Sequence, residues 1–266
     1  MKTANRDIGW KYDLPSPLMP PELECSITEV FPPPTQINKI FLDLPLSRIP
    51  FRGILSIAGL AILLTSAVIS VFLAIHFIAS PRTDHTLISQ LILAWIATFY
   101  LLTPYIRLDL MLPRNEPIRF NRCRQKVYFY HYRFDRIRPL GRKSWGVKPV
   151  AYEWNTITAE YYRVYLPMGH GGVVEKVMLS VRDPETDEVI DRLPLADNLE
   201  KGEQYWSIAR QFMQSGPEEL PDFKYAPHDP ERDDHPNPFH RLAPKVEWPA
   251  DMDLESRTAP GSGDKS

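Results

Sequence analysis

The sequence predicts an α+β membrane protein in which a transmembrane helical hairpin is followed by a small antiparallel β-sheet domain closed by a C-terminal helix. Two long apolar windows, Gly53–Ala79 and Leu87–Tyr105, predict the hairpin. Short stretches of apolar and polar residues that alternate between Ile118 and Leu195 predict roughly four to six strands. An amphipathic stretch that starts near Asp197 predicts the closing helix.

These features divide the 266 residues into four parts. Residues 1–50 form a Pro-rich cytoplasmic arm, 51–112 the transmembrane hairpin, 113–216 a cytoplasmic α+β domain, and 217–266 a Pro-rich acidic tail. The arm contains nine prolines and no long helical period, so we expect an extended, irregular strap that packs along the domain. The tail contains nine prolines and twelve acidic residues, so we expect it to be largely disordered.

The apolar windows are long enough to cross a bilayer. The first has 27 residues without Asp, Glu, Lys or Arg, and a helix needs about 20 to span the hydrocarbon layer. The second, extended to Leu112, has 26 residues and carries Trp95, Tyr100 and Tyr105 as interface anchors. Only "SPRTDHT" lies between them, which predicts two antiparallel spans. The alternatives, a buried hairpin in a soluble protein or a cleaved signal peptide, fit the window lengths and positions less well.

Basic residues gather on one side of the predicted hairpin. Residues 107–148 contain twelve Lys or Arg and three Asp or Glu, whereas the link between the windows has only Arg82 and Asp84. Positive residues favour the cytoplasmic side, so we expect both termini in the cytoplasm. Part of this basic collar is expected to contact anionic membrane lipids. The collar residues are Arg114, Arg119, Arg122, Arg124 and Lys126. A nucleic-acid surface is the alternative, and the position beside a membrane favours lipid.

The predicted domain follows the second span. "PIRFN" and "KVYFYHYR" predict a β-hairpin with one buried face, and "KVMLSVRDPETDEVIDRLPL" predicts another with its turn at "DPETD". Between them, "VAYEWNTITAEYYRVYL" predicts one long strand or two short ones. Asp197 and Glu200 have the spacing of a capping box, and Gly216-Pro217 predicts the end of the helix. Such a bent sheet closed by one helix is the architecture of pleckstrin-homology-like (PH-like) domains.

Motifs for catalysis are not found. "GHGG" at Gly169–Gly172 lacks the Gly-Lys-Ser/Thr of a phosphate-binding loop, and the chain has no Gly-x-Ser-x-Gly elbow. The irregular "HDPERDDHPNPFH" in the tail favours a solvated acidic segment over a metal site. We therefore expect no enzymatic activity, no cofactor and no metal site.

A resemblance points to a function. The two early apolar windows, "PRNEPIRFNRCRQKVYFY", "YEW" and "YWSIARQFMQSGPEELP" resemble a family of uncharacterised bacterial two-span inner-membrane proteins, often encoded beside type VI secretion toxins and thought to act as immunity proteins. The resemblance covers about Arg52 to Pro221 and implies a protein that binds and neutralises a cognate toxin encoded by the adjacent gene.

The partner-binding residues are expected among the aromatic residues of the cytoplasmic domain. Tryptophan and tyrosine are the residue types from which binding hot spots are usually built, which favours Trp145, Trp154 and Tyr161. A membrane-anchored PH-like lipid-binding or scaffold protein without a toxin partner is the alternative, and the sequence leaves both open.

Overall fold

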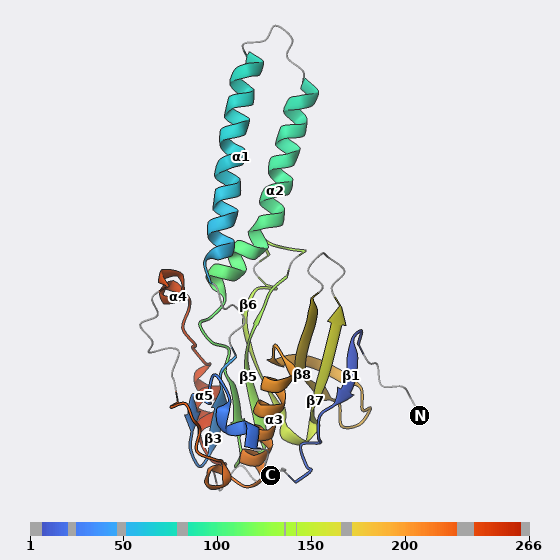
Figure 1. The fold of residues 1–266 in the computed structure, drawn as a ribbon, viewed down its shortest axis with the longest axis vertical. Coiled ribbons are helices and arrows are strands. Elements are labelled where there is room, and N and C mark those ends of the chain that lie inside the picture. Colours follow the sequence, from blue (N-terminus) through green and yellow to red (C-terminus); the bar gives the residue numbers. More distant parts are fainter. Residues whose placement is uncertain are drawn as a thin grey trace.

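The computed structural model describes residues 7–20, 25–46, 52–78, 85–135, 137–141, 143–165, 172–227 and 237–261. Two long helices project from one end of a domain built of two sheets and shorter helices (Figure 1). The long helices are α1 (Ile54–Ile78) and α2 (His85–Met111). Both are long and apolar enough to cross a membrane. The predicted α+β class and the predicted helical pair are therefore confirmed.

Polar contacts join the two long helices at their base. The Asp109 carboxylate on α2 accepts hydrogen bonds from the Gly53 backbone N–H at 2.9 Å and from the Ser56 hydroxyl at 2.7 Å. It thereby occupies the first turn of α1, where backbone N–H groups have no helical partner. Farther along the pair, Trp95 Nε1 donates to Ser70 Oγ at 2.7 Å. The helices thus meet the domain as one unit.

Nine strands within the described residues form two antiparallel sheets. The four-stranded sheet contains β1 (Trp10–Asp13), β7 (Ile157–Tyr165), β8 (Val173–Arg182) and β9 (Val189–Ala196), in that order. The five-stranded sheet contains β2 (Gln36–Ile37), β3 (Phe41–Leu44), β4 (Ile118–Asn121), β5 (Lys126–Arg133) and β6 (Gly146–Glu153). Six of these strands lie in the segment where four to six are predicted.

Both predicted β-hairpins are present. Ile118 of β4 is paired with Phe129 of β5, and Leu179 of β8 is paired with Leu193 of β9. The segment between the hairpins forms two strands, because the 3₁₀ turn Trp154–Thr156 separates β6 from β7 and sends them into different sheets. The predicted single buried face is wrong for β4, whose four residues are all buried because α5 covers its outer side.

The arm is more regular than predicted. It supplies β1 to one sheet and both β2 and β3 to the other, together with the 3₁₀ helix η1 (Cys25–Glu29). Strand β3 pairs with β4 although the whole helical pair lies between them in the sequence. The arm is therefore part of the sheets and not an irregular strap.

The tail also carries regular structure in its described part. Helix α4 spans Pro238–Leu242 and α5 spans Ala250–Arg257, and the short 3₁₀ helix η3 (Pro217–Glu219) precedes them. The prediction of a largely disordered tail is therefore wrong for 237–261, because α5 is fixed by side chains of the five-stranded sheet, as described below.

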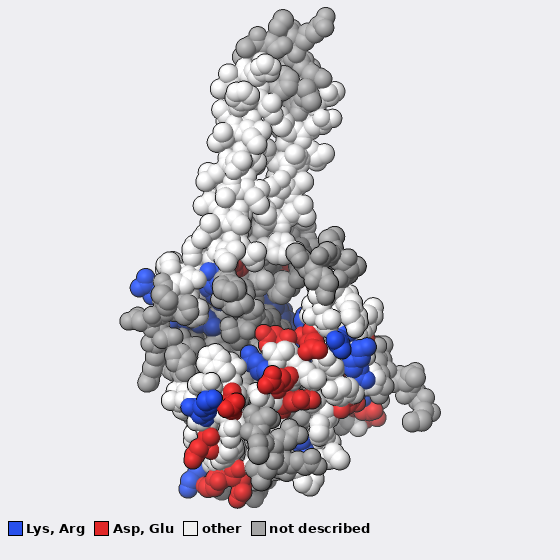
Figure 2. Space-filling model, viewed as in Figure 1, with Lys and Arg blue, Asp and Glu red and all other residues white. Residues whose placement is uncertain are grey.

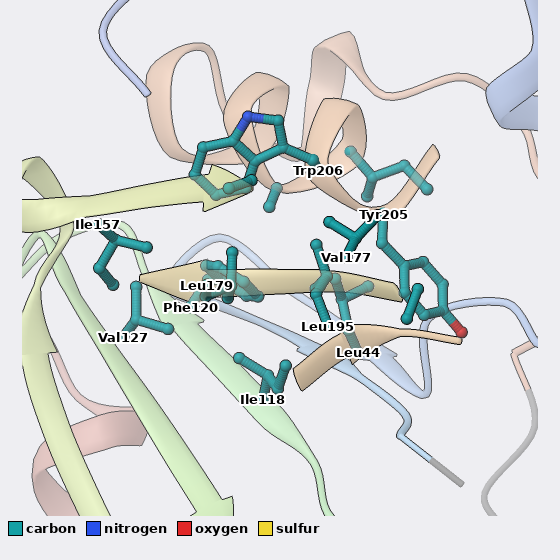
Figure 3. Packing of buried hydrophobic residues seen from close by; sticks show 14 of the residues in the cluster. Leu44, Ile118, Phe120, Val127, Ile157, Val177, Leu179, Leu195, Tyr205 and Trp206 are labelled. Atoms are coloured by element: carbon teal, nitrogen blue, oxygen red, sulfur yellow. The ribbon is translucent and has the colours of Figure 1, made fainter. Parts of the chain in front are cut away.

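Helix α3 (Leu199–Gln214) closes the core between the two sheets. Figure 3 shows Tyr205 and Trp206 of this helix facing Val177 and Leu179 of β8. Trp206 also lies 5.0 Å from the ring of Trp154. Gly202 permits the close approach, since a Cβ there would lie 2.2 Å from a methyl carbon of Val177.

The ends of α3 follow the predicted pattern with one correction. The helix stops before Gly216-Pro217, as predicted. Its N-cap is Asn198, whose side chain accepts a hydrogen bond from the Lys201 backbone N–H at 2.8 Å. The predicted capping box of Asp197 and Glu200 is therefore one residue early, because Asn is as good a cap as Asp and stands closer to the first helical turn.

Candidate functional site

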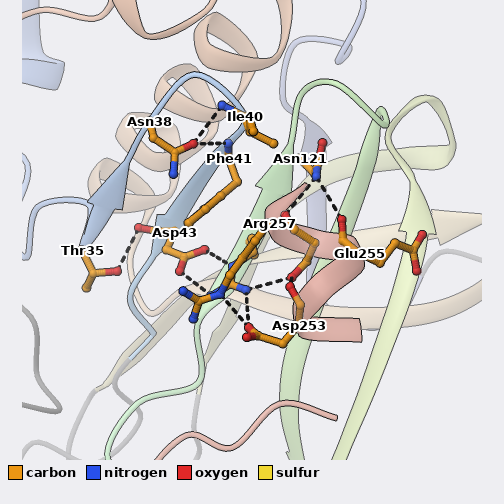
Figure 4. A network of polar contacts seen from close by, with 11 residues as sticks. Thr35, Asn38, Ile40, Phe41, Asp43, Asn121, Asp253, Glu255 and Arg257 are labelled. Carbon is orange, nitrogen blue, oxygen red and sulfur yellow. Dashed lines mark hydrogen bonds and ion pairs between the residues drawn. The ribbon is translucent and has the colours of Figure 1, made fainter. Parts of the chain in front are cut away.

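Arg119, a predicted lipid contact, is buried in the five-stranded sheet. Its side chain is 3% exposed and forms a two-pronged ion pair with Asp43 of β3, at 2.7 and 2.9 Å. The same guanidinium donates to Asp253 Oδ1 at 2.9 Å and to Ser256 Oγ at 2.8 Å, both on α5. Figure 4 shows Asp43 and Asp253 brought together in this network. Arg119 is not available to lipid, so that prediction is wrong for this residue.

The charged groups of this network shift the pKa values of its carboxylates. Burial raises the pKa of Asp43, and the hydrogen bonds and charge of Arg119 act in the opposite direction. Burial also acts to raise the pKa of Asp253, but hydrogen bonds from Arg257 and Arg119 bring it below its ordinary value. Burial also acts to raise the pKa of Glu255, but hydrogen bonds from Lys126 and Tyr128, with the charges of Lys126 and Arg124, together bring it below its ordinary value. The tail acids are therefore held as carboxylates beside the sheet.

Three other collar residues also hold the tail. Lys126 Nζ lies 3.1 Å from Glu255 of α5, and Arg124 Nε donates to the Thr258 carbonyl at 3.1 Å. Arg114 donates to the carbonyl of Arg241, at the end of α4. The fifth, Arg122, lies beside Gly216, where an added Cβ would be 3.0 Å from its Nη1. All four are half-buried, so the collar serves mainly to bind the tail to the five-stranded sheet.

The three aromatic residues predicted to bind a partner are buried. Trp154 and Tyr161 are 1% and 5% exposed and belong to the main core. Trp145 is 7% exposed and lies under the Arg107 guanidinium, 4.5 Å from its ring centre, at the base of α2. These side chains stabilise the fold, and their prediction as a partner surface is wrong.

A different aromatic pair lies on the surface. Phe31 of the arm is 69% exposed, Tyr225 of the tail is 40% exposed, and their rings meet edge to face at 5.4 Å. Behind them, the Tyr205 hydroxyl donates to the Pro32 carbonyl at 2.8 Å, and the Lys224 backbone N–H donates to the Thr28 carbonyl at 2.9 Å. The pair therefore stands on a fixed backbone.

Three acidic side chains and two lysines lie around this pair, and one of the acids, Glu29, is paired with Lys224 at 2.9 Å. A shallow hollow of about 290 Å³ beside Phe31 is lined by Glu29 and Glu200, and one of about 340 Å³ beside Tyr225 is lined by Asp222. Figure 2 shows Asp and Glu gathered on the face of the domain around α3. We call the surface formed by Phe31, Tyr225, Glu29, Glu200 and Asp222 the aromatic-acidic face.

A second concave site lies beneath the long helices. This cleft, of about 710 Å³, is bounded by the end of α2, by the ends of β5, β8 and β9, and by the start of α3. Figure 2 shows a recess at this place, with basic side chains in its depth. We call it the hairpin cleft. The sequence offers no local signal for either site, because the residues of each come from segments far apart in the chain.

The described residues contain no group of three or more His, Cys, Asp or Glu side chains placed to hold a metal ion. Cys123 is exposed on the β4–β5 turn.

Comparison with known proteins gives one match. Residues 95–260 match a family of unknown function, DUF6708. The chain belongs to this family. The matched span runs from α2 to just beyond α5, so the family unit includes the tail helix, whereas β1, β2, β3 and α1 precede it. No curated protein and no solved structure matches the chain.

Proposed function

We propose that the chain is a non-enzymatic immunity protein of the bacterial inner membrane, which binds and neutralises a cognate type VI secretion toxin through its cytoplasmic domain. The observation that supports a protein-binding role is the aromatic-acidic face. The resemblance to two-span immunity-associated proteins supports the class of partner, which we expect to be encoded by the adjacent gene. The two sheets closed by α3 are consistent with a PH-like fold, which belongs to the same proposal.

Geometry favours the domain over the far side of the membrane as the place of binding. The link between the two apolar windows is seven residues long, whereas a specific protein interface needs about 800 Å² on each partner. The domain at the other end of the helical pair presents both sheets and α3. A toxin neutralised by direct contact would therefore be bound on the side of the domain, in the cytoplasm.

The chemistry of the aromatic-acidic face suits a basic protein. Exposed Phe31 and Tyr225 provide rigid apolar contact area at little cost in side-chain entropy, and clusters of such aromatic residues commonly dominate binding energy. The carboxylates around them attract a partner of opposite charge and speed its approach. A toxin that acts on nucleic acid carries such a positive surface, so we propose this class of target for the face.

Our first prediction tests this assignment in the full chain. Replacing both aromatic residues, Phe31→Ala with Tyr225→Ala, should weaken toxin binding by about 2 kcal/mol or more, roughly 30-fold, because the central contact area is lost. Both side chains are exposed, so the variant should fold normally. The measurements are survival of cells that express the neighbouring toxin, and co-purification of the toxin with the membrane-extracted protein.

Tyr165→Ala is the matched control, because Tyr165 is also exposed, at 66%, but lies at the end of β7. It should protect cells as the unchanged chain does. Full protection and an intact complex in the Phe31 and Tyr225 variant would show that the toxin is bound elsewhere. Failure of the unchanged chain to protect cells or to bind the toxin would reject the immunity role itself.

A second candidate function, lipid binding, is favoured by a separate observation, the hairpin cleft.

A further inference from the structure

The contacts between α2 and the loop that joins β5 to β6 indicate how close the domain would lie to a bilayer. The Tyr100 hydroxyl of α2 donates to the Ile137 carbonyl, and Arg107 donates to the carbonyls of Pro139 and Gly141 at 2.9 and 2.8 Å. Tyr100 precedes the end of α2 by eleven residues, which is about 16 Å along a helix axis. If α2 crosses a membrane, this loop lies within the headgroup layer or deeper.

The side chains of the loop fit that position. Ile137 is 79% exposed and Leu140 is 68% exposed, although both belong to a loop that is fixed to α2. Burying such apolar side chains among acyl chains is favourable, at about 25 cal/mol for each Å² removed from water. The end of the domain that bears this loop is therefore expected to contact lipid.

The hairpin cleft opens at this same end and has an amphipathic lining. Leu108 of α2, Leu112 just after this helix and Leu46 of the arm form an apolar wall. Across from them stand basic side chains from three elements, Arg133 of β5, Lys176 of β8 and Lys201 of α3. A phospholipid has apolar acyl chains inside the membrane and a charged headgroup at its surface. The apolar wall of the cleft therefore suits the acyl end of such a lipid, and the basic side chains suit its headgroup.

One basic side chain of the cleft lining is available to bind an anion. Asp191 of the lining lies 3.1 Å from Arg133, and Asp197 lies 3.8 Å from Lys201. Two further lining groups face acids of the domain, since His131 Nδ1 is 3.7 Å from Glu116 and Arg192 Nε is 3.5 Å from Glu160. Lys176 is exposed and has no ion pair within the described parts of the chain. An anion that enters the cleft therefore meets an uncompensated ammonium group.

We propose that the hairpin cleft binds the headgroup of an anionic phospholipid of the leaflet that contacts Ile137 and Leu140. The lipid phosphate lies beside Lys176, and the glycerol and first acyl carbons lie against Leu108 and Leu112. This site differs from the collar residues of the β4–β5 hairpin, which bind the tail. It does not depend on the proposed toxin, whose basic surface fits the aromatic-acidic face and not this basic cleft.

The test, our second prediction, uses the full chain in detergent micelles and native mass spectrometry. Dioctanoyl phosphatidylglycerol is titrated against dioctanoyl phosphatidylcholine, and glycerol 3-phosphate is added as a competitor. The unchanged chain should prefer the anionic lipid. Lys176→Glu should reduce its affinity for phosphatidylglycerol about tenfold or more, because each basic residue near an anionic headgroup contributes about fivefold and the change reverses a charge.

Two further variants make the result specific. Asp197→Asn removes an acid from the lining and should raise the affinity for phosphatidylglycerol. Lys39→Glu makes the same change as Lys176→Glu at an exposed lysine in the β2–β3 turn, outside the cleft, and should leave binding unchanged. Equal binding of the two lipids, or equal effects of the Lys176 and Lys39 changes, would overturn the proposal. Displacement of the lipid by glycerol 3-phosphate at similar concentration would show a site for free phosphate and would likewise overturn it.

Discussion

Arg119 connects three segments that are remote in the sequence. Its guanidinium donates to Asp43 of the arm and to Asp253 and Ser256 of the tail, while its own backbone belongs to β4. The ring of Phe41 lies 4.8 Å from the guanidinium carbon. An ion pair so deeply buried contributes little net stability compared with an apolar pair, but the loss of one partner leaves the other charged and without compensation.

Our third prediction concerns this residue. Arg119→Ala should lower the free energy of unfolding by about 3–5 kcal/mol, because Asp43 is only 4% exposed and would keep a buried charge. Arg257→Ala is the matched control, since Arg257 also binds Asp253, at 2.8 Å, but its side chain is 46% exposed. The Arg257→Ala change should lower the free energy of unfolding by less than about 1 kcal/mol. The measurement is urea unfolding of the full chain in detergent, followed by tryptophan fluorescence, and similar losses for the two variants would contradict this role for Arg119.

The helical pair is an insertion between two neighbouring strands. Strand β3 precedes α1 and β4 follows α2, yet the two strands pair from Phe41↔Asn121 to Leu44↔Ile118. The flanking segments also meet, because Asn115 Oδ1 accepts from the Leu46 backbone N–H at 3.0 Å and Glu116 N donates to the Leu46 carbonyl at 3.1 Å. The domain therefore consists of residues from both sides of the hairpin.

Our fourth prediction follows from this insertion. A chain in which residues 47–112 are replaced by a short Gly-Ser linker should fold without detergent, because the linker joins two segments already in contact and the main core is retained. A fragment that begins at Pro113 should not fold cooperatively, because it lacks β1, β2 and β3 and leaves the edges of β4 and β7 unpaired. Far-ultraviolet circular dichroism and urea unfolding of both chains provide the measurement. Cooperative unfolding of the Pro113 fragment at the same urea concentration would contradict it.

Elements with local partners could be predicted from the sequence. The β4–β5 and β8–β9 hairpins join strands that are neighbours in the chain, and α3 carries its apolar stripe and its stop signal within one segment. Strand β3 could not be predicted in the same way. All four of its residues are buried, so it has no alternation of apolar and polar residues, and its partner strand lies beyond the helical pair. Helix α5 is short and polar, and side chains of β4 and β5, among them Arg119, Asn121 and Lys126, hold it in place.

Site residues were harder to predict for a related reason. The sequence around a tryptophan does not show whether its side chain faces the core or solvent, so Trp154, in the turn between β6 and β7, cannot be distinguished by sequence from a surface aromatic residue. Phe31 and Tyr225 come from the arm and the tail, and only the packing of both onto α3 and η1 brings them together. The collar residues have the correct charge for lipid, but Arg119 and Lys126 pair with acids of the tail, and Arg114 and Arg124 donate to tail carbonyls.

At the scale of the whole molecule, the arm and the tail lie at the same end of the helical pair. The arm contributes β3 to the five-stranded sheet, and the tail helix α5 lies against β4 of that sheet (Figure 1). Two antiparallel membrane spans would have this consequence, since an even number of crossings returns the chain to its starting side. The unequal distribution of Lys and Arg would then select the side.

Our fifth prediction concerns this orientation. Between 107 and 148, the basic residues that the structure describes lie at the domain end, whereas the seven-residue link between the apolar windows contains one Arg and one Asp. Cytoplasmic segments retain Lys and Arg during insertion, so a reporter fused after Ser266 should read as cytoplasmic and one inserted at Thr83 as periplasmic. The alkaline phosphatase and green fluorescent protein pair suits this measurement, because each is active on only one side. A periplasmic reading at Ser266 would contradict the orientation and would move both the aromatic-acidic face and the hairpin cleft to the outer side of the membrane. Opposite readings for Ser266 and for a reporter placed before Asp7 would instead contradict the hairpin itself, since β3 of the arm and α5 of the tail both lie against β4 and cannot be on different sides of a bilayer.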